Sequence, residues 1–239
     1  MKTGKKMYLS QANLHIPNDK PIIFWDTCAL LDIIRIPIRD NLNMNDLECY
    51  ERIADYIDNS HVISITSGLV INEFTDHYSD EHNKLIQTQT NLKNKVLNYA
   101  NFMASAKKKA RLTNAINLLN IEHRLNVVLM RILKKTFVLK EENIYRDFAD
   151  YRLRNKMAPA ARKSEYKDCY IWGTFIKLVH AINPTSNYIS FMSVNTKDYT
   201  EINGRGLHNH IITDCYLPSM HVVLNIGQLY GDLRHELGF

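Results

Sequence analysis

Four acidic side chains occupy positions from which they could do chemistry together: Asp26, Glu73, Asp168 and Asp198. Asp26 directly follows a short apolar run, and Asp198 comes shortly after another. Glu73 lies about two turns into one expected helix, and Asp168 opens a second. Carboxylates gathered at one place repel one another unless a cation lies between them. Ligands that offer only oxygen select hard cations, so the four residues indicate a Mg²⁺ or Mn²⁺ site.

Such a site suits the hydrolysis of phosphodiester bonds. Bound hard cations generate hydroxide from water and stabilise the leaving oxygen. Each acid also has a simpler explanation: Asp26 as a helix N-cap, Glu73 as a solvated helix residue, Asp168 beside a helix dipole, and Asp198 in an Asx turn. The simple explanations do not account for all four acids gathering together, so we favour the metal site.

Alternating strand and helix signals supply the scaffold. Short β-branched or aromatic runs predict strands at 22–25, 61–66, 188–194 and 221–226, with a weaker one at 136–139. Helical patterns lie between them at 27–36, 46–57, 68 to about 78, 141–156 and 166–182. This alternation predicts an α/β fold with a mainly parallel sheet covered on both faces. Ligands of such sheets bind beyond the carboxyl ends of the strands, where the four acids would converge.

A basic segment at about 82–135 interrupts this alternation. From 84 to 135 it holds eleven Lys and Arg residues and one acid, Glu122, and it has no Gly or Pro. A stripe at helical spacing runs along its second half: Leu118, Ile121, Leu125, Val128 and Ile132. We expect a long basic helical hairpin, with a break near SAKKKARLT, inserted into a single domain that spans 1–239.

Composition excludes several other classes of protein. The chain has 239 residues, 45% of them hydrophobic and 23% charged, which is enough to bury a full core. It has no apolar signal-peptide region and no run of about 18 apolar residues, so we expect a cytoplasmic protein without a membrane span. Its four cysteines lie far apart without a C-x-x-C pair, which argues against a zinc site or a disulfide framework.

Four segments resemble the PIN-like nuclease domain: IIFWDTCALLDII, SITSGLVINEF, YKDCYIWGTFIKL and FMSVNTKDY. The resemblance is closest to larger bacterial members with a KDxxIW helix and an SxNTKD strand end, and it covers about 20–80 and 136–230. It implies a parallel sheet whose acids bind Mg²⁺ or Mn²⁺ and cut RNA. Many members are toxins of toxin–antitoxin pairs, defence-type enzymes or RNA-processing enzymes.

The resemblance also implies roles for individual residues. The catalytic metal ligands would be Asp26, Glu73, Asp168 and Asp198. Thr27 would be the hydroxyl neighbour of the first ligand. Asn195 would steady the strand end that precedes the last ligand. If the register is wrong, the fallback ligands are Asp32, Asp76 and Asp214, which we otherwise expect to be ordinary surface residues.

Basic residues could hold the polyanionic substrate through its phosphates. The densest group lies in the hairpin (Lys107, Lys108, Lys109 and Arg111), and a second lies just before the third motif (Arg162, Lys163 and Lys167). Tyr166 and Tyr170 could stack on unpaired bases, whereas we expect Trp172 to belong to the core.

Several alternatives stay open on sequence alone. A nuclease for DNA flaps or single strands would use the same acids, and a small-molecule phosphatase would not need the basic arm. A non-catalytic nucleic-acid-binding or antitoxin-binding module would need the arm but not the acids. The hairpin could instead dock a second copy of the chain or an acidic antitoxin through its apolar stripe.

Overall fold

The computed structural model describes residues 4–17, 19–39, 43–105, 121–163, 165–182, 188–201 and 206–239. Its centre is a six-stranded sheet in which every neighbouring pair of strands is parallel. The strand order is β1-β4-β3-β2-β5-β6. The strands are β1 (Lys6–Met7), β2 (Ile22–Trp25), β3 (Ile63–Ser67), β4 (Phe137–Leu139), β5 (Ile189–Met192) and β6 (Met220–Val223). The predicted α/β class is confirmed.

Helices cover both faces of the sheet, so its central strands are buried even where they carry polar side chains. Every residue of β2, β3 and β5 is buried, as expected for parallel strands that contact helices on both sides. In the sheet interior, the few polar side chains satisfy one another. The indole of Trp25 donates a hydrogen bond to Ser64 Oγ at 2.8 Å, and Ser64 Oγ lies 2.6 Å from Thr136 Oγ1.

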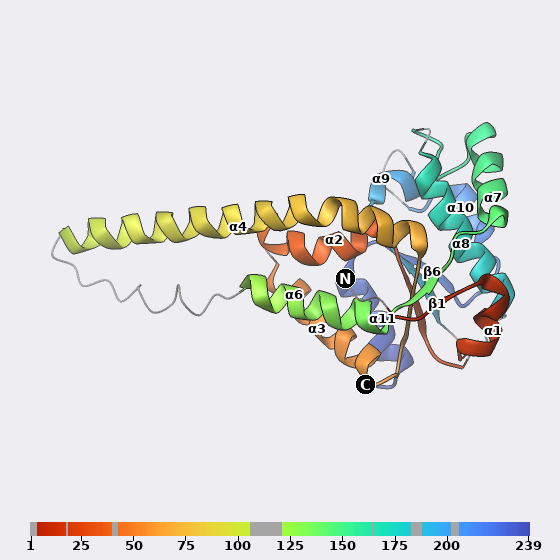
Figure 1. The fold of residues 1–239 in the computed structure, drawn as a ribbon, viewed down its shortest axis with the longest axis horizontal. Helices are drawn as coiled ribbons and strands as arrows, with labels where there is room; N and C mark the ends of the chain where they lie inside the picture. Colours follow the sequence, from red (N-terminus) through yellow and green to blue (C-terminus); the bar gives the residue numbers. More distant parts are fainter. Residues whose placement is uncertain are drawn as a thin grey trace.

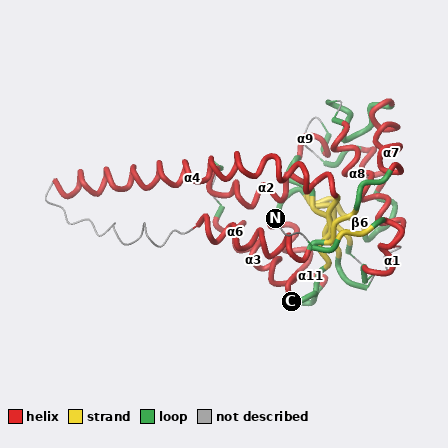
Figure 2. Tube along the Cα trace, viewed as in Figure 1, coloured by secondary structure: helices red, strands yellow, loops and turns green. Residues whose placement is uncertain are grey.

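Two groups of helices pack on the sheet, and Figure 2 shows the strands between them. One group comprises α2 (Thr27–Arg35), α3 (Met44–Asp58), α4 (Gly68–Ser105), α6 (Ile121–Lys135) and α11 (Ile226–Glu236). The other comprises α1 (Ala12–His15), α7 (Asn143–Arg154) and α8 (Tyr166–Ile182). The short helices α9 (Thr196–Tyr199) and α10 (Asn209–Asp214) follow β5, and 3₁₀ turns occupy Leu9–Gln11 and Ile36–Ile38.

A glycine permits the close packing of α7 on α8. A Cβ atom at Gly173 would lie only 2.6 Å from a ring carbon of Phe148. Any other residue at this position would therefore push the two helices apart.

Helix α4 is much longer than predicted. It runs for 38 residues without interruption, or ~57 Å at 1.5 Å per residue, and its C-terminal half extends well beyond the other described helices (Figure 1). The base of α4 is part of the core through Val70 and Phe74, whereas Leu92 and Tyr99 further along are exposed. No helix boundary therefore exists at 82, where we expected the insertion to begin.

The apolar stripe of the second hairpin helix belongs to the core. Leu125, Val128 and Ile132 of α6 are buried, and α6 packs on α2 and α3. Ile121 is half-buried, and Leu118 lies outside the described residues. The idea that this stripe docks a partner is wrong for the residues in α6, because their surface is already covered. Among the described residues, no helix combines the length and apolarity that crossing a membrane requires.

Candidate metal and nuclease site

Asp26 lies where β2 ends and α2 begins. It is the N-cap of α2, and its Oδ1 accepts a hydrogen bond from the Thr27 amide at 2.7 Å. Its Oδ2 accepts one from Ser193 Oγ at 2.6 Å. The side chain is only 2% exposed. Burial raises the pKa of Asp26 to about 6, and the nearby charges of Glu73 and Asp198 add to the rise.

Sheet topology explains why this carboxylate is in a functional position. The chain leaves β2 toward β3 on one side, while β5 pairs with β2 on the other side. Ligand crevices in open parallel sheets form at such switch points, beyond the carboxyl ends of the strands. The Asp26 amide donates to Met192 O at 3.0 Å. This bond aligns the end of β2 with the end of β5, where Ser193 and Asn195 follow.

Glu73 reaches the same edge of the sheet from the second turn of α4. Its Oε2 accepts a hydrogen bond from Thr27 Oγ1 at 2.8 Å. Its Oε1 forms an ion pair with Lys167 Nζ at 3.0 Å. Lys167, which the sequence suggested as a phosphate contact, therefore pairs with Glu73 in this structure.

The last two acids come from α8 and from the turn after β5. Asp168 lies in the first turn of α8 and is half-buried. Burial, and after it the charges of Asp26 and Asp198, raise its pKa to about 8. Asp198 accepts a hydrogen bond from Asn195 Nδ2 at 2.5 Å. Asn195, which was expected to steady the end of the strand, thus contacts the last acid directly.

The structure brings the four predicted acids into one electrostatic group. Burial is the largest cause of the raised pKa values of Asp26 and Asp168, and each of the two also responds to Glu73 and Asp198. Like charges that lie close together raise one another's pKa values in this way.

The donor set fits a hard cation by its chemistry. Its atoms are carboxylate oxygens with hydroxyl and amide neighbours, the ligand type that Mg²⁺ and Mn²⁺ prefer. Within the described ranges, no three His, Cys, Asp or Glu side chains are arranged as a metal cluster as they stand. The hydrogen bonds give a reason, since Ser193, Lys167 and Asn195 occupy oxygens of three of the acids.

Sequence reasoning missed two residues of this site. Ser193 directly bonds Asp26 and also accepts from the Asn195 amide at 3.1 Å. It could have been noticed, because it is the serine of the quoted segment FMSVNTKDY. Tyr199 is buried, and its hydroxyl has no hydrogen-bond partner among the described residues. Burial raises its pKa, as do the charges of Asp26 and Asp168, so its ring lies close to both acids.

Of the basic and aromatic residues predicted to hold nucleic acid, only some lie exposed near the site. Arg162 and Lys163 are exposed, and Arg162 donates to Thr200 O at 2.8 Å. Tyr166 is half-buried, but Tyr170 is buried, which rules out stacking on a base in this arrangement. Trp172 belongs to the core as expected. The hairpin group Lys107, Lys108, Lys109 and Arg111 lies outside the described residues.

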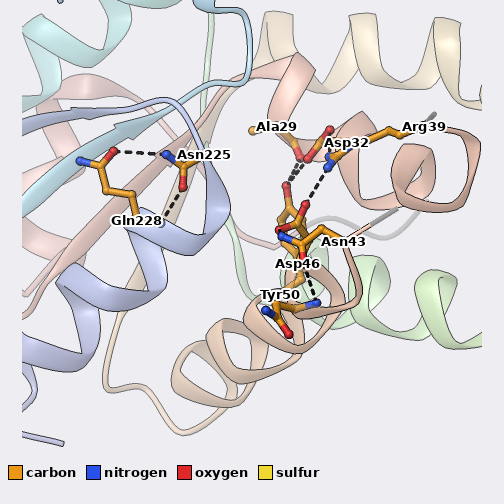
Figure 3. A network of polar contacts seen from close by, with 9 residues as sticks. Ala29, Asp32, Arg39, Asn43, Asp46, Tyr50, Asn225 and Gln228 are labelled. Carbon is orange, nitrogen blue, oxygen red and sulfur yellow. Dashed lines mark hydrogen bonds and ion pairs between the residues drawn. The ribbon is translucent and has the colours of Figure 1, made fainter. Parts of the chain in front are cut away.

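Two of the fallback acids are not surface residues, contrary to the prediction. Asp32 is buried, pairs with Arg39 and accepts a hydrogen bond from Tyr50 at 3.0 Å (Figure 3). Asp214 pairs with the buried Arg152 at 2.5 Å and also accepts from the Trp172 indole at 2.6 Å. Both acids therefore have structural partners of their own. Asp76 is exposed, as expected.

Comparison with known proteins identifies one related family. The sequence model described as PIN domain matches residues 23–199, which is more than half of the chain and includes all four acids. No curated protein and no solved structure matches the chain at a significant level.

Proposed function

Because this chain belongs to the PIN domain family, whose members are generally nucleases and often RNases, we propose that it is a Mg²⁺- or Mn²⁺-dependent endoribonuclease. One observation carries the proposal: four carboxylates from distant parts of the chain meet at the switch point of the sheet, and burial and mutual repulsion raise the pKa values of two of them. In a structural ion-pair network, basic side chains would neutralise these carboxylates. A site built to hold a cation instead gathers more carboxylates than its basic neighbours neutralise.

In this proposal the metal ligands are Asp26, Glu73, Asp168 and Asp198. A bound divalent cation would polarise the phosphodiester and supply hydroxide at neutral pH. The chain's own residues orient the ligands. Ser193 and the Thr27 amide hold the two oxygens of Asp26, and Asn195 holds Asp198.

Basic side chains near the site would bind the phosphates on either side of the scissile bond. Arg162, Lys163 and Lys167 are exposed beside the third acid. Lys93 and Lys95 are exposed on the extended part of α4, about 30 Å or more along the helix from Glu73, and would contact more distant phosphates. Contacts of this kind supply affinity without sequence preference. The hairpin residues Lys107, Lys108, Lys109 and Arg111 would add to them.

The biological setting is a further part of the proposal. In this proposal the enzyme cleaves RNA in the cytoplasm and has a toxin or defence role. An antitoxin or a second copy of the chain would then have to bind a surface other than the buried stripe of α6, since that stripe packs in the core.

A cleavage assay tests the proposal directly. Purified wild-type protein is incubated with end-labelled RNA and DNA in Mg²⁺, Mn²⁺ or EDTA, beside Asp26→Asn and a matched control, Asp80→Asn, at an exposed acid on the same long helix as Glu73. We expect cleavage of RNA that needs the metal, persists in Asp80→Asn and is lost in Asp26→Asn. Cleavage that survives EDTA, or full activity of Asp26→Asn, would overturn the proposal. Cleavage of DNA alone would reassign the substrate, and binding without cleavage would indicate a non-catalytic module.

A further inference from the structure

Lys167 makes an unusual contact for a residue beside an acidic site. Of the described residues, it is the only base that forms an ion pair with any of the four acids, joining Glu73 Oε1 at 3.0 Å. The other oxygen of Glu73 accepts from Thr27 Oγ1 at 2.8 Å. Both oxygens of Glu73 are therefore occupied by donors of the protein itself.

The two members of the pair differ in their freedom. The Glu73 side chain is 15% exposed, whereas the Lys167 side chain is 58% exposed. A lysine ammonium is a compact charge on a flexible stem, so it can leave Glu73 without any movement of the backbone. Lys167 also directly precedes Asp168 at the start of α8, so its backbone stays beside the acids when the ammonium leaves Glu73.

These contacts make the ammonium a competitor of any divalent cation that would use Glu73. We propose that Lys167 is a displaceable counter-ion: it neutralises Glu73 before metal binds, gives up that oxygen when metal arrives, and then contacts a phosphate of the nucleic acid. The inference rests on the proposed function. It makes Lys167 a positioning residue that couples metal binding to substrate binding.

The coupling has a defined sign. A nucleic acid that holds the released ammonium keeps it away from Glu73, so it should tighten the binding of metal. By linkage, the metal must tighten the binding of nucleic acid by the same factor. An ordinary surface ion pair would produce neither effect, because its lysine has no phosphate to bind after it leaves the carboxylate.

Calorimetric titration of Mg²⁺ and Mn²⁺ into the metal-free protein tests the competition. The variants are Lys167→Gln, Glu73→Gln and the double variant, with Lys134→Gln at an exposed lysine of α6 as the control. We expect Lys167→Gln to bind metal about three- to fivefold more tightly, the range for an exposed ion pair. In the Glu73→Gln background the same change should have little effect, since no carboxylate is left to compete for. If the positive charge of Lys167 only repelled cations in general, Lys167→Gln would tighten metal binding equally with Glu73 and with Gln at that position. That result would overturn the proposal.

Two further readouts complete the test. In EDTA, Lys167→Gln should lower the melting temperature by about 2–4 °C, because Glu73 loses its counter-ion. With hydrolysis-resistant phosphorothioate RNA, wild type should bind metal more tightly than without RNA, and Lys167→Gln should lose most of that gain. Unchanged metal affinity in Lys167→Gln would refute the counter-ion role even if the enzyme cleaves RNA. A wild-type protein that binds no metal at all would refute the proposed function itself, and the counter-ion role with it.

Discussion

Replacing Asp26 with Asn removes one buried negative charge while keeping the shape of the side chain. Asn Oδ1 can still accept from the Thr27 amide, as Asp26 does at 2.7 Å. The Ser193 hydroxyl, now 2.6 Å from Oδ2 of Asp26, can rotate and accept from the new amide group, since a hydroxyl both donates and accepts. The substitution therefore changes charge with little change in hydrogen bonding.

The size of the effect follows from the pKa of Asp26. Burial raises it from 3.8 to about 6, and each unit corresponds to ~1.4 kcal/mol, which gives ~3 kcal/mol in all. Because the folded-state pKa lies above the unfolded value, the associated stability is fully present below pH ~4 and is lost as the pH rises through about 6. In EDTA, wild type should lose this amount of stability between acidic and neutral pH in addition to the loss that the raised pKa of Asp168 causes, and Asp26→Asn should show only the latter loss.

Thermal unfolding in EDTA at pH ~4.5, ~6 and ~8 measures the difference. At the highest pH we expect Asp26→Asn to melt up to about 6–12 °C above wild type, from 2–4 °C per kcal/mol for a chain of this size. At the lowest pH the gap should shrink to about a third, since pH ~4.5 still lies above the unfolded-state pKa of 3.8. Saturating Mg²⁺ should reverse the ranking, because only wild type keeps the full ligand set. The exposed control Asp80→Asn should follow wild type throughout. A variant less stable than wild type at pH ~8 in EDTA would show that Asp26 is a favourable structural cap and refute the reasoning.

Three other outcomes follow from the same structure. Asp168→Asn and Asp198→Asn should lose most RNA cleavage while their circular dichroism spectra stay those of wild type; retained turnover in either would remove it from the proposed ligand set. Asp214→Asn should lower the free energy of unfolding in urea by about 3–5 kcal/mol, because it leaves the buried Arg152 without its ion-pair partner; a loss under ~1 kcal/mol would mean that water already solvates the pair. Gln in place of all four basic hairpin residues, Lys107, Lys108, Lys109 and Arg111, should shrink the slope of log affinity for single-stranded RNA against log salt by roughly 0.7 per lost contact. An unchanged slope would mean that the RNA binds elsewhere on the protein.

The elements predicted best are those with one strong local signal. The run 22–25 is wholly apolar and ends on Asp26, and the structure has β2 at Ile22–Trp25. Helix α8 has the predicted bounds, Tyr166–Ile182, because apolar residues recur along its whole length and no proline interrupts them. Strand β1 was missed because it has only two residues, Lys6–Met7, and one of them is charged. Its place in the sheet comes from pairing with β4, which no local pattern encodes.

The polar contacts of the site were harder to predict than its acids. The acids could be found because each follows a strand or starts a helix, and parallel topology then places those points at one edge. The Lys167–Glu73 pair joins α8 to α4, and such a contact depends on how two distant helices pack. Asp32 and Asp214 were taken for surface residues because acids usually are. Asp32 is buried and Asp214 is half-buried, because Arg39 and Arg152, supplied from elsewhere in the fold, neutralise them.

The helix that carries Asp168 must resist the repulsion among the acids, and its contacts on the far side explain how it does. Trp172, one turn after Asp168, donates to Asp214 at 2.6 Å, and Gly173 allows α7 to pack directly against α8. Loosening these contacts would let Asp168 move away from the other charges, which relieves repulsion but spoils the ligand set. Trp172→Phe, which loses the indole hydrogen bond and part of a buried ring, should therefore weaken metal binding in calorimetry more than the exposed control Asp80→Asn does. Equal metal affinities for the two variants would mean that the rest of the core holds α8 in place without this bond.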